Sequence, residues 1–264
     1  MTNKKPLFCF LVSALLISSS TIQGQDLDSL LNNKRIYQTE NIGEHPLPKI
    51  DGVLDEKIWE LGEWHGDFTQ QQPVGGVEGT ENTYVKVLYD YSNLFVAIVC
   101  QDKEPELIRD IFDRRDALSG DMTGIAIDSY YDKRTAFEFN LSAAGQKMDL
   151  KHSGDYMWDF NWNAVWDGAT SLNDTAWVAE MKIPFSQMRY ANQEEHIWGM
   201  HVWRWIERKF EEDQWQFIPK EAPAMVYLFG ELKGVENIRS SRQVEFLPYM
   251  LCSYGKYADE GGVD

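Results

Sequence analysis

Apolar and polar positions alternate in several short segments of the chain, as they do in strands that bury one face. Residues 85–89 and 94–100 alternate in this way on either side of residues 90–93, which form a polar turn sequence. Residues 125–131 and 135–141 repeat the arrangement around a short charged turn. Each pair of segments therefore predicts an antiparallel β-hairpin.

Three further segments are predicted to be strands, namely residues 146–152, 177–183 and 197–210. The last of them is apolar on both faces at its start, which is typical of a central strand. Helical signals are few: Asp55 is placed to cap one turn, and residues 105–112 form a short helix that opens with proline. The sequence predicts an all-β fold, an antiparallel β-sandwich of the jelly-roll-like type, with one or two short helices.

The chain is expected to divide into four parts. Residues 1–24 have the character of a secretory signal peptide, with two lysines before an apolar run at 7–17 and small residues after it. That run is shorter than the ~20 residues of a spanning helix. Residues 25–43 are predicted to be a polar leader, 44–236 the sandwich, and 237–264 a linker with the truncated start of a C-terminal β domain. The expected location is the periplasm, the outer membrane or the cell surface.

Composition narrows the class of protein. The chain has 264 residues, of which 43% are hydrophobic and 25% are charged, so the disordered and low-complexity classes are excluded. The net charge of -17 argues against sequence-independent binding to nucleic-acid phosphates, and no nucleic-acid partner is expected. Beyond the signal peptide only Cys100 and Cys252 remain, too few for a disulfide framework or a cysteine-based zinc site.

The segment from 158 to 166 is the first candidate ligand site. Read with a period of two, its tryptophans, one phenylalanine and one alanine share one face of a strand, and asparagines and aspartates share the other. Two interpretations remain open. The rings either stack on sugars while the amides bind hydroxyls, or they form the aromatic inner face of the sandwich. The candidate sugar contacts in this segment are Trp158, Asn161 and Trp162.

A second aromatic cluster contains Arg204, between two tryptophans, and Trp215. Trp215 follows the polar residues 211–214, so we expect it to lie on a loop and to be at least partly exposed. An indole on a loop is a candidate ligand contact, and the alternative is that it closes the end of the sandwich. Arg204 and Trp215 are therefore added to the candidate carbohydrate-binding residues.

Carboxylates are crowded between residues 102 and 132, and hard oxygen ligands of this kind suit Ca²⁺. Asp116, Asp121 and Asp128 are the candidate ligands for a structural calcium ion, and a solvated loop face is the alternative. The five histidines are scattered without metalloprotease spacing. The chain has no nucleophile-elbow, phosphate-loop or dinucleotide-binding motif. No catalytic residue is predicted.

Several short motifs resemble one known family. Residues 50–56, followed by Trp59, look like the opening motif of the carbohydrate-binding module family 9-like domain, and residues 177–184 and 229–232 are similar to its later landmarks. The resemblance implies a β-sandwich that binds a sugar between two tryptophans and uses Ca²⁺ for stability. Trp215 corresponds to the later of these tryptophans. No tryptophan stands near residues 119–121, where the earlier one would lie.

Other motifs widen the resemblance. Residues 67–70 and 115–116 resemble large exported bacterial proteins that carry a C-terminal domain of the outer-membrane-barrel type, and residues 242–249 look like its first strand. The resemblance implies an exported carbohydrate-binding module that takes part in polysaccharide breakdown, as an accessory to a glycoside hydrolase acting on O-glycosyl bonds. The alternative is an interaction domain of an outer-membrane barrel without sugar affinity. Direct glycoside hydrolysis, and a haem-binding sandwich with Met148 or a histidine as ligand, are further alternatives.

Overall fold

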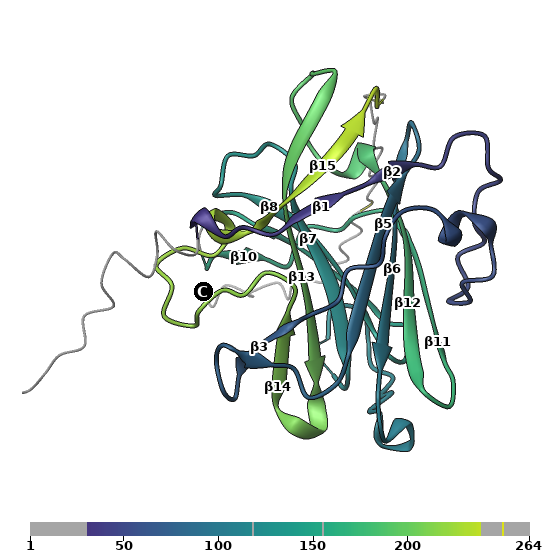
Figure 1. Cartoon of the computed structure of the whole chain (residues 1–264), viewed down its shortest axis with the longest axis vertical. Helices are drawn as coiled ribbons and strands as arrows, with labels where there is room; N and C mark the ends of the chain where they lie inside the picture. The colour runs from purple at the N-terminus through teal and green to yellow at the C-terminus, as the bar shows by residue number, and fades with distance from the viewer. Residues whose placement is uncertain (1–30, 118, 155, 239–249, 251–264) are drawn as a thin grey trace, which may run out of the picture.

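The computed structural model describes residues 31–117, 119–154, 156–238 and 250. These residues form two β-sheets that face each other (Figure 1). In this part of the chain, no helix is both long enough and apolar enough to cross a membrane. The predicted signal peptide, and nearly all of the predicted C-terminal segment, lie outside the described residues.

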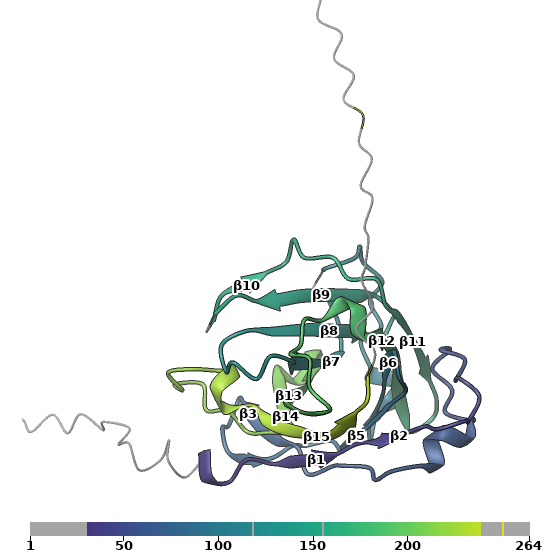
Figure 2. The same cartoon turned by 90° about the horizontal axis from the view of Figure 1, so that it is seen from above.

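The larger sheet is almost wholly antiparallel, and only β1 and β15 pair in parallel. Its central strand, β13, has 12 residues, so two shorter strands, β14 and β15, share one of its edges. Seen from above, this sheet is strongly curved (Figure 2). In spatial order its main strands are β10 (Trp158–Asp159), β9 (Lys147–His152), β8 (Ala136–Ser142), β7 (Met122–Asp128), β13 (Glu195–Ile206), β14 (Glu211–Gln214), β3 (Thr69–Gln72) and β4 (Val77–Glu78), with β15 (Gly230–Glu236) beside β13 and β1 (Ile36–Gln38) beside β15.

The smaller sheet packs against one face of the larger. Its strands are β11 (Asp167–Leu172), β12 (Ala176–Pro184), β6 (Asn93–Gln101), β5 (Thr83–Tyr89) and β2 (Glu40–Asn41). Apart from Leu31 and Asn32, which are α-helical, the helical residues in the described ranges belong to 3₁₀ turns. These turns are η1 (Lys57–Glu60), η2 (Pro105–Leu107), η3 (Phe185–Gln187), η4 (Glu207–Lys209) and η5 (Val226–Leu228).

The main hydrophobic core lies between the two sheets, as strand alternation requires. Along β7, Ile125 and Ile127 point inward, and along the facing β6, Val96 and Ile98 do the same; all four are fully buried. Trp177 from β12 joins the same cluster. Burial of these side chains stabilises the sandwich by about 25 cal/mol for each Å² of apolar surface removed from water.

The outer face of the larger sheet is also apolar, which is unusual for a sheet face that looks away from the core. Part of this face is covered by residues 216–229, where Ile218, Val226 and Phe229 pack over Ala126. The neighbouring part, over Met122, Met148 and Leu150, is left uncovered by that segment.

The opening motif of the sequence is held by one buried carboxylate. The backbone N–H groups of Asp51 and Gly52 both donate to the Oε2 atom of Glu180 in β12, at 2.9 Å. Gly52 has a φ angle of +83°, and a Cβ atom there would lie 2.6 Å from the backbone of Thr170. Glycine is therefore required at this position. The motif has a structural role, because it fixes the chain against the edge of the smaller sheet.

The predicted all-β sandwich and both predicted hairpins are confirmed, since β5 pairs with β6 and β7 pairs with β8. The strands expected at residues 146–152 and 177–183 are present as β9 and β12. The helix expected over residues 105–112 is wrong beyond its first turn, and Asp55 is not a cap, because Glu56 occupies the N-cap position of η1.

The predicted polar leader is part of the sandwich. Residues 36–41 form β1 and β2, which join the larger and the smaller sheet respectively. Tyr37 is buried, its hydroxyl donates to the carbonyl of Glu63, and it accepts the N–H of Val87. The sandwich therefore begins before residue 44. Two strands of two and three residues are too short to show a period in the sequence.

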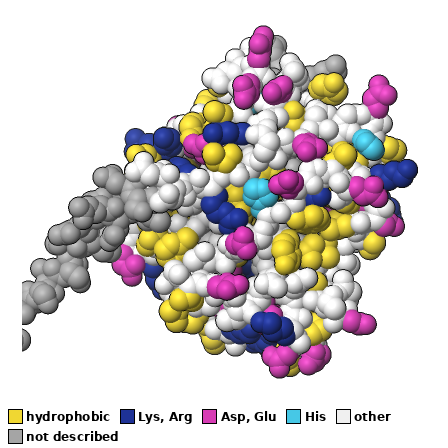
Figure 3. Space-filling view, viewed as in Figure 1, with side chains coloured by type: hydrophobic (Ala, Val, Ile, Leu, Met, Phe, Trp, Pro, Cys, Tyr) yellow, Lys and Arg dark blue, Asp and Glu magenta, His cyan; other side chains and the backbone are white. Residues whose placement is uncertain are grey.

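The negative charge is not gathered into one patch on the face seen in Figure 3, where acidic side chains are scattered among basic and apolar ones. Although the net charge is -17, the acidic side chains on that face do not form one continuous acidic surface. Mixed surface charge of this kind favours solubility more than it favours any one charged partner.

Candidate functional site

The uncovered part of the outer face is a hollow of about 250 Å³. Its side chains come from β8, β9, β10, β13 and β14 and from the covering segment. They are Glu138, Met148, Leu150, Trp158, Phe160, His201, Trp203, Glu212 and Met225. An apolar hollow with a few converging polar groups is the usual form of a site for a small ligand.

Strand register explains why these residues meet. Leu150 pairs with Glu138, Glu138 with Ala126, and Ala126 with His201, so the four residues form one row across four strands. Residues directly opposite each other in an antiparallel sheet project from the same face. Trp203, two residues after His201 on β13, projects from that face as well. The floor of the hollow is therefore fixed by rigid elements rather than by loops.

Glu138 is the charged group of the floor. Its Oε2 atom lies 2.6 Å from Nε2 of His152, and its Oε1 atom accepts a hydrogen bond of 3.0 Å from the indole N–H of Trp203. Burial alone would raise the pKa of Glu138, but the contacts with His152 and Trp203 outweigh burial and hold its pKa below the usual value. Glu138 is consequently an ionised acceptor in a fixed position.

His201 supplies uncommitted hydrogen-bonding capacity. Its side chain is fully buried, and neither ring nitrogen has a partner among the described residues. The ring stacks on Phe229, with centroids 5.1 Å apart and planes 13° apart. Burial lowers the pKa of His201 to about 4, so the ring is neutral near pH 7 and offers one donor and one acceptor. An unpartnered buried polar group costs about 1–3 kcal/mol, so a ligand that pairs with it gains that energy back.

The rim of the hollow combines exposed rings with a second carboxyl group. Trp158 is 51% exposed and Phe160 is 42% exposed. Glu212 accepts a hydrogen bond of 2.7 Å from the side-chain amide of Gln214, and burial raises its pKa. The site therefore offers flat apolar surfaces at the rim and directed polar groups on the floor. This combination suits a ligand that has apolar faces and polar edges.

The expectation that Trp215 is partly exposed is wrong. The residue continues the line of β14, its backbone N–H donates to the carbonyl of Val202, and its side chain is 1% exposed. The ring packs against both Tyr37 and His65, and the guanidinium of Arg35 lies over it, 4.9 Å from the ring centroid. Polar residues before Trp215 suggested a loop, but they form β14, which pairs with β13 on one side and β3 on the other and places alternate side chains inward.

The segment from 158 to 166 does not form one strand with all its rings on one face. Only Trp158–Asp159 are in a strand, β10, and the chain then turns. Trp162 and Trp166 pack in the core against Phe139, whereas Trp158 and Phe160 face the hollow. The core interpretation therefore applies to Trp162 and Trp166, and Trp158 stays a candidate ligand contact. Asn161 is exposed and bonds to Asp159, and it is absent from the lining of the hollow.

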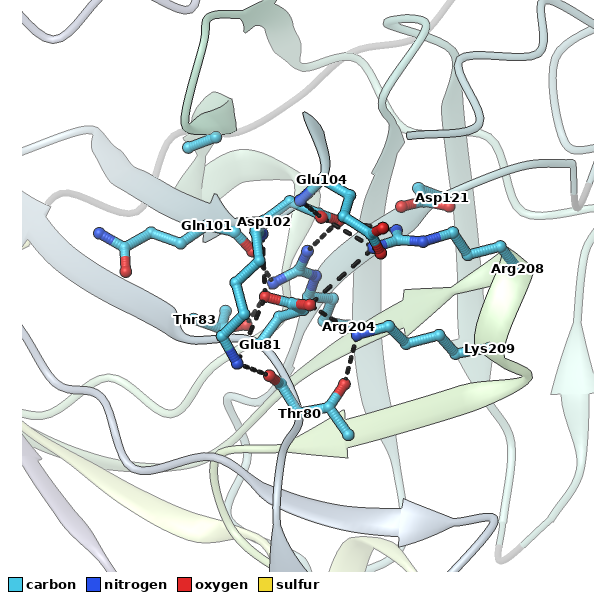
Figure 4. Close-up of polar contacts among 12 residues, drawn as sticks. Thr80, Glu81, Thr83, Gln101, Asp102, Glu104, Asp121, Arg204, Arg208 and Lys209 are labelled. Atoms are coloured by element: carbon cyan, nitrogen blue, oxygen red, sulfur yellow. Dashed lines mark hydrogen bonds and ion pairs between the residues drawn. The ribbon is translucent and has the colours of Figure 1, made fainter. Parts of the chain in front are cut away.

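Arg204 does not reach the hollow. It alternates with Trp203 and Trp205 along β13, so it projects to the inner side, where it is fully buried. Its guanidinium donates to Thr83 and to the carbonyl of Gln101. Asp102 lies 3.7 Å away in a network that also contains Arg208, Lys209 and Glu81 (Figure 4). This network ties β13 to the hairpin of the smaller sheet, so the role of Arg204 is structural.

The three aspartates predicted to bind calcium lie apart. Asp121 precedes β7 and Asp128 ends it, so seven residues of extended chain, about 23 Å, separate them. Asp128 accepts backbone N–H groups of Asp132 and Lys133, and Asp116 lies beside Asp149. Nowhere in the described ranges do three histidine, cysteine or acidic side chains gather in a way that would hold a metal ion. The three carboxylates do not fit a common calcium site.

The sequence-based candidates include one residue of the hollow, Trp158, and miss the floor. The signal for the floor was present in β8, where Glu138 and Asn140 alternate with Phe137 and Phe139. Two polar residues opposite two core phenylalanines mark the outer face of a strand. What the sequence could not show is that this outer face is concave and only half covered.

The comparisons with known proteins agree with this architecture. A carbohydrate-binding module of family 9 from Caldicellulosiruptor kristjanssonii, in complex with glucose, is similar with a TM-score of 0.55 and 16% identity, over 81% of this chain and 100% of that chain. The same kind of module in complex with cellotriose gives a TM-score of 0.52 at 15% identity, over 81% of this chain and 99% of that one.

A putative carbohydrate-binding protein from Bacteroides uniformis is similar with a TM-score of 0.61 and 10% identity, over 76% of this chain and 99% of that chain. No curated protein matches the sequence. The family described as carbohydrate family 9 binding domain-like matches residues 50–214, more than half of the 264 residues. The chain therefore belongs to the carbohydrate family 9 binding domain-like family.

Proposed function

We propose that this protein is a carbohydrate-binding module and that a sugar ring binds in the hollow on the outer face of the larger sheet. One observation carries the proposal: a fully buried histidine with two unpartnered ring nitrogens lies in a hollow rimmed by exposed aromatic rings. Sugars have the matching chemistry, because their C–H faces stack on Trp158 and Phe160 while their hydroxyls hydrogen-bond to His201 and Glu138. Family membership and the glucose and cellotriose complexes of similar modules support the same reading.

The chain itself is proposed to be non-catalytic. A glycosidase needs a pair of carboxyl groups free to act on the two sides of the glycosidic bond. Both oxygens of Glu138 are engaged, one with His152 and one with Trp203. We infer that the module serves polysaccharide breakdown by holding the glycan for an enzyme that acts on O-glycosyl bonds. Release of reducing sugar from xylan or cellulose by the purified chain would contradict this inference.

The direct test is titration calorimetry with glucose, cellotriose, xylose and xylotriose, supported by affinity electrophoresis on xylan and soluble cellulose. We expect binding of at least one sugar by the unmodified protein. His201→Phe keeps a flat ring stacked on Phe229 and removes both ring nitrogens, so affinity should fall while the protein stays folded. The matched control is His45→Phe, at an exposed position away from the hollow. Folded protein that binds none of the glycans would overturn the proposed function.

The location and the larger context are proposals as well. We infer that the chain is exported through residues 1–24, which N-terminal sequencing of the exported protein would test. The alternative function is an interaction domain of an outer-membrane barrel protein. The sequence favours it in one respect, since no tryptophan stands near residues 119–121 to complete a two-tryptophan clamp. A folded chain that retains such a barrel in a pull-down and binds no glycan would support the alternative.

A further inference from the structure

A second hollow, of about 570 Å³, lies on the same sheet beside the first. It is formed where β3, β13 and β14 meet the start of the covering segment, and Trp205, Phe210 and Phe217 supply its aromatic surfaces. None of the residues predicted from the sequence to bind sugar lies in it. Its volume is larger than that of the hollow over His201, so it has room for a group as large as another sugar ring.

The two hollows are neighbours on the same face of the sheet. Trp203 lines the first hollow and Trp205 lines the second, and they lie two residues apart on β13 and so on the same face of the sheet. Glu212, at the edge of the first hollow, pairs in register with Trp205 on one side and with Gln72 on the other. Both of these neighbours line the second hollow. Glu212 therefore lies at the boundary between the two hollows.

An exposed ring stands over the second hollow in an unusual backbone conformation. Phe210 ends η4 with a φ angle of +50°, in the left-handed region where glycine or asparagine normally stands. Its side chain is 69% exposed and meets Trp205 edge to face, with ring centroids 6.3 Å apart. A turn that needs only to close the hairpin would be better served by glycine. The phenylalanine keeps a large apolar surface at the mouth of the hollow.

Polar groups flank these rings. The ammonium group of Lys220 donates to the side-chain carbonyl of Gln72 at 3.2 Å, and both residues line the second hollow. The indole N–H of Trp205 donates to Glu207, so the polar edge of that ring already has a partner. Both hollows place aromatic surface next to polar side chains, although the first has carboxylates and a histidine where the second has Gln72 and Lys220. Aromatic rings beside hydrogen-bonding side chains are suited to a ring that carries hydroxyls.

We propose that the second hollow is a second sugar subsite and that the ligand is an oligosaccharide of at least two rings. One ring occupies the hollow over His201, and the next passes Glu212 and stacks against Trp205 and Phe210. This inference rests on the proposed function, because it extends the same binding face. It predicts that affinity rises with the number of sugar rings in the ligand. It assigns to Phe210 the contact that favours the longer sugar.

The test compares short and long sugars on one variant. Titration calorimetry with glucose and cellotriose, and with xylose and xylotriose, should give the unmodified protein at least tenfold higher affinity for a trisaccharide than for its monosaccharide. Phe210→Gly removes the ring and suits the left-handed backbone, so folding should be preserved. In this variant the affinity ratio between trisaccharide and monosaccharide should fall to within about twofold while monosaccharide affinity stays unchanged. Phe112→Gly, at another exposed phenylalanine, is the control and should leave the ratio as it is.

Three outcomes would overturn the inference, and they differ from each other. An unmodified protein that binds both sugars of a series equally well has one subsite, and the proposed function survives. A Phe210→Gly variant that keeps the high ratio shows that the second ring binds elsewhere. Folded protein that binds no sugar of either series removes the proposed function and the second subsite together.

Discussion

The two faces of the larger sheet use tryptophan in different ways. On the inner face, Trp198 and Trp215 are fully buried, and their indole N–H groups have no partner among the described residues. On the outer face, Trp203 and Trp205 donate theirs to the carboxylates of Glu138 and Glu207. The inner rings act as apolar filling, whereas the outer rings are oriented by polar partners and remain accessible from a hollow.

This difference shows why a high aromatic content does not identify a binding surface. The chain has 10 tryptophans and 13% aromatic residues, and most of the strongest sequence signals came from rings that fill the core. Within the larger sheet, the outer rings differ from the inner ones in having a carboxylate partner, and a carboxylate that fixes an indole can also accept from a ligand hydroxyl. The following substitutions test that distinction, beginning with the largest expected effect.

Trp215→Ala should lower the free energy of unfolding by about 3–5 kcal/mol, the range for truncation of a buried aromatic side chain. The ring is 1% exposed and packs under the guanidinium of Arg35, so the substitution leaves a cavity and removes the contact between the guanidinium and the ring. Urea denaturation followed by circular dichroism measures the change. Sugar affinity of the folded fraction should be unaltered.

The matched control for this substitution is Trp64→Ala, since Trp64 is a tryptophan with 37% exposure. Its main contact is the ammonium of Lys86, 4.9 Å from the ring centroid, and loss of such a contact costs about 1 kcal/mol. If Trp215→Ala keeps normal stability and no longer binds sugar, Trp215 contacts the ligand and is not a core residue.

Asp213→Asn tests the buried polar groups of the inner face. Burial, followed by the neighbouring charge of Glu211, raises the pKa of Asp213 from 3.8 to about 8. The folded protein therefore holds a proton that the unfolded chain releases, and stability falls as pH rises from about 4 to about 8. Asparagine has no proton to lose. The free energy of unfolding of the variant should therefore rise relative to that of the unmodified protein, by up to about 1.4 kcal/mol per pH unit across that window.

Urea denaturation of both proteins at pH 4, 6 and 8 measures this gain. The control is Asp174→Asn, at an exposed position, which should shift stability equally at the three pH values. If the difference between Asp213→Asn and the unmodified protein is constant from pH 4 to pH 8, Asp213 is ionised in the folded state. The positive charges of Arg204 and Lys209, which lower the pKa of Asp213, would then outweigh burial.

Much of the fold could be predicted from the sequence because hairpins leave a local signal. The alternation of Val85, Val87 and Tyr89 before a polar turn is enough to place β5 and β6. The short strands β1 and β2 could not be placed, since their burial depends on partners far along the chain, such as Lys233 and Leu88.

The site was less predictable for a similar reason. Its floor residues, Glu138, His201 and Glu212, come from three strands and look like ordinary outward-facing positions in the sequence. Only the curvature of the sheet and the partial cover by residues 216–229 make them converge. Trp158 was found because a cluster of aromatic residues is conspicuous, but the same signal also selected Trp162, which packs in the core.

Trp158→Ala should weaken sugar binding by about 1–3 kcal/mol, by analogy with the stacking of nucleic-acid bases on aromatic side chains. Stability should change by no more than about 0.5 kcal/mol, because the ring is 51% exposed. Calorimetry with the best-bound sugar and a urea melt of the same sample give both quantities. A loss of stability without a loss of affinity would show that Trp158 contributes to packing and not to sugar binding.

Asn161→Ala is expected to have the smallest effect and marks the limit of the binding face. Its amide donates to Asp159 at 3.2 Å, and the backbone N–H that also bonds to Asp159 survives the substitution. The residue is exposed and does not line the hollow, so both stability and sugar affinity should change by no more than about 0.5 kcal/mol. Titration calorimetry in parallel with Trp158→Ala makes the comparison direct. If Asn161→Ala loses as much affinity as Trp158→Ala, the ligand extends over the 159–163 turn, and the rim of the site is wider than the hollow.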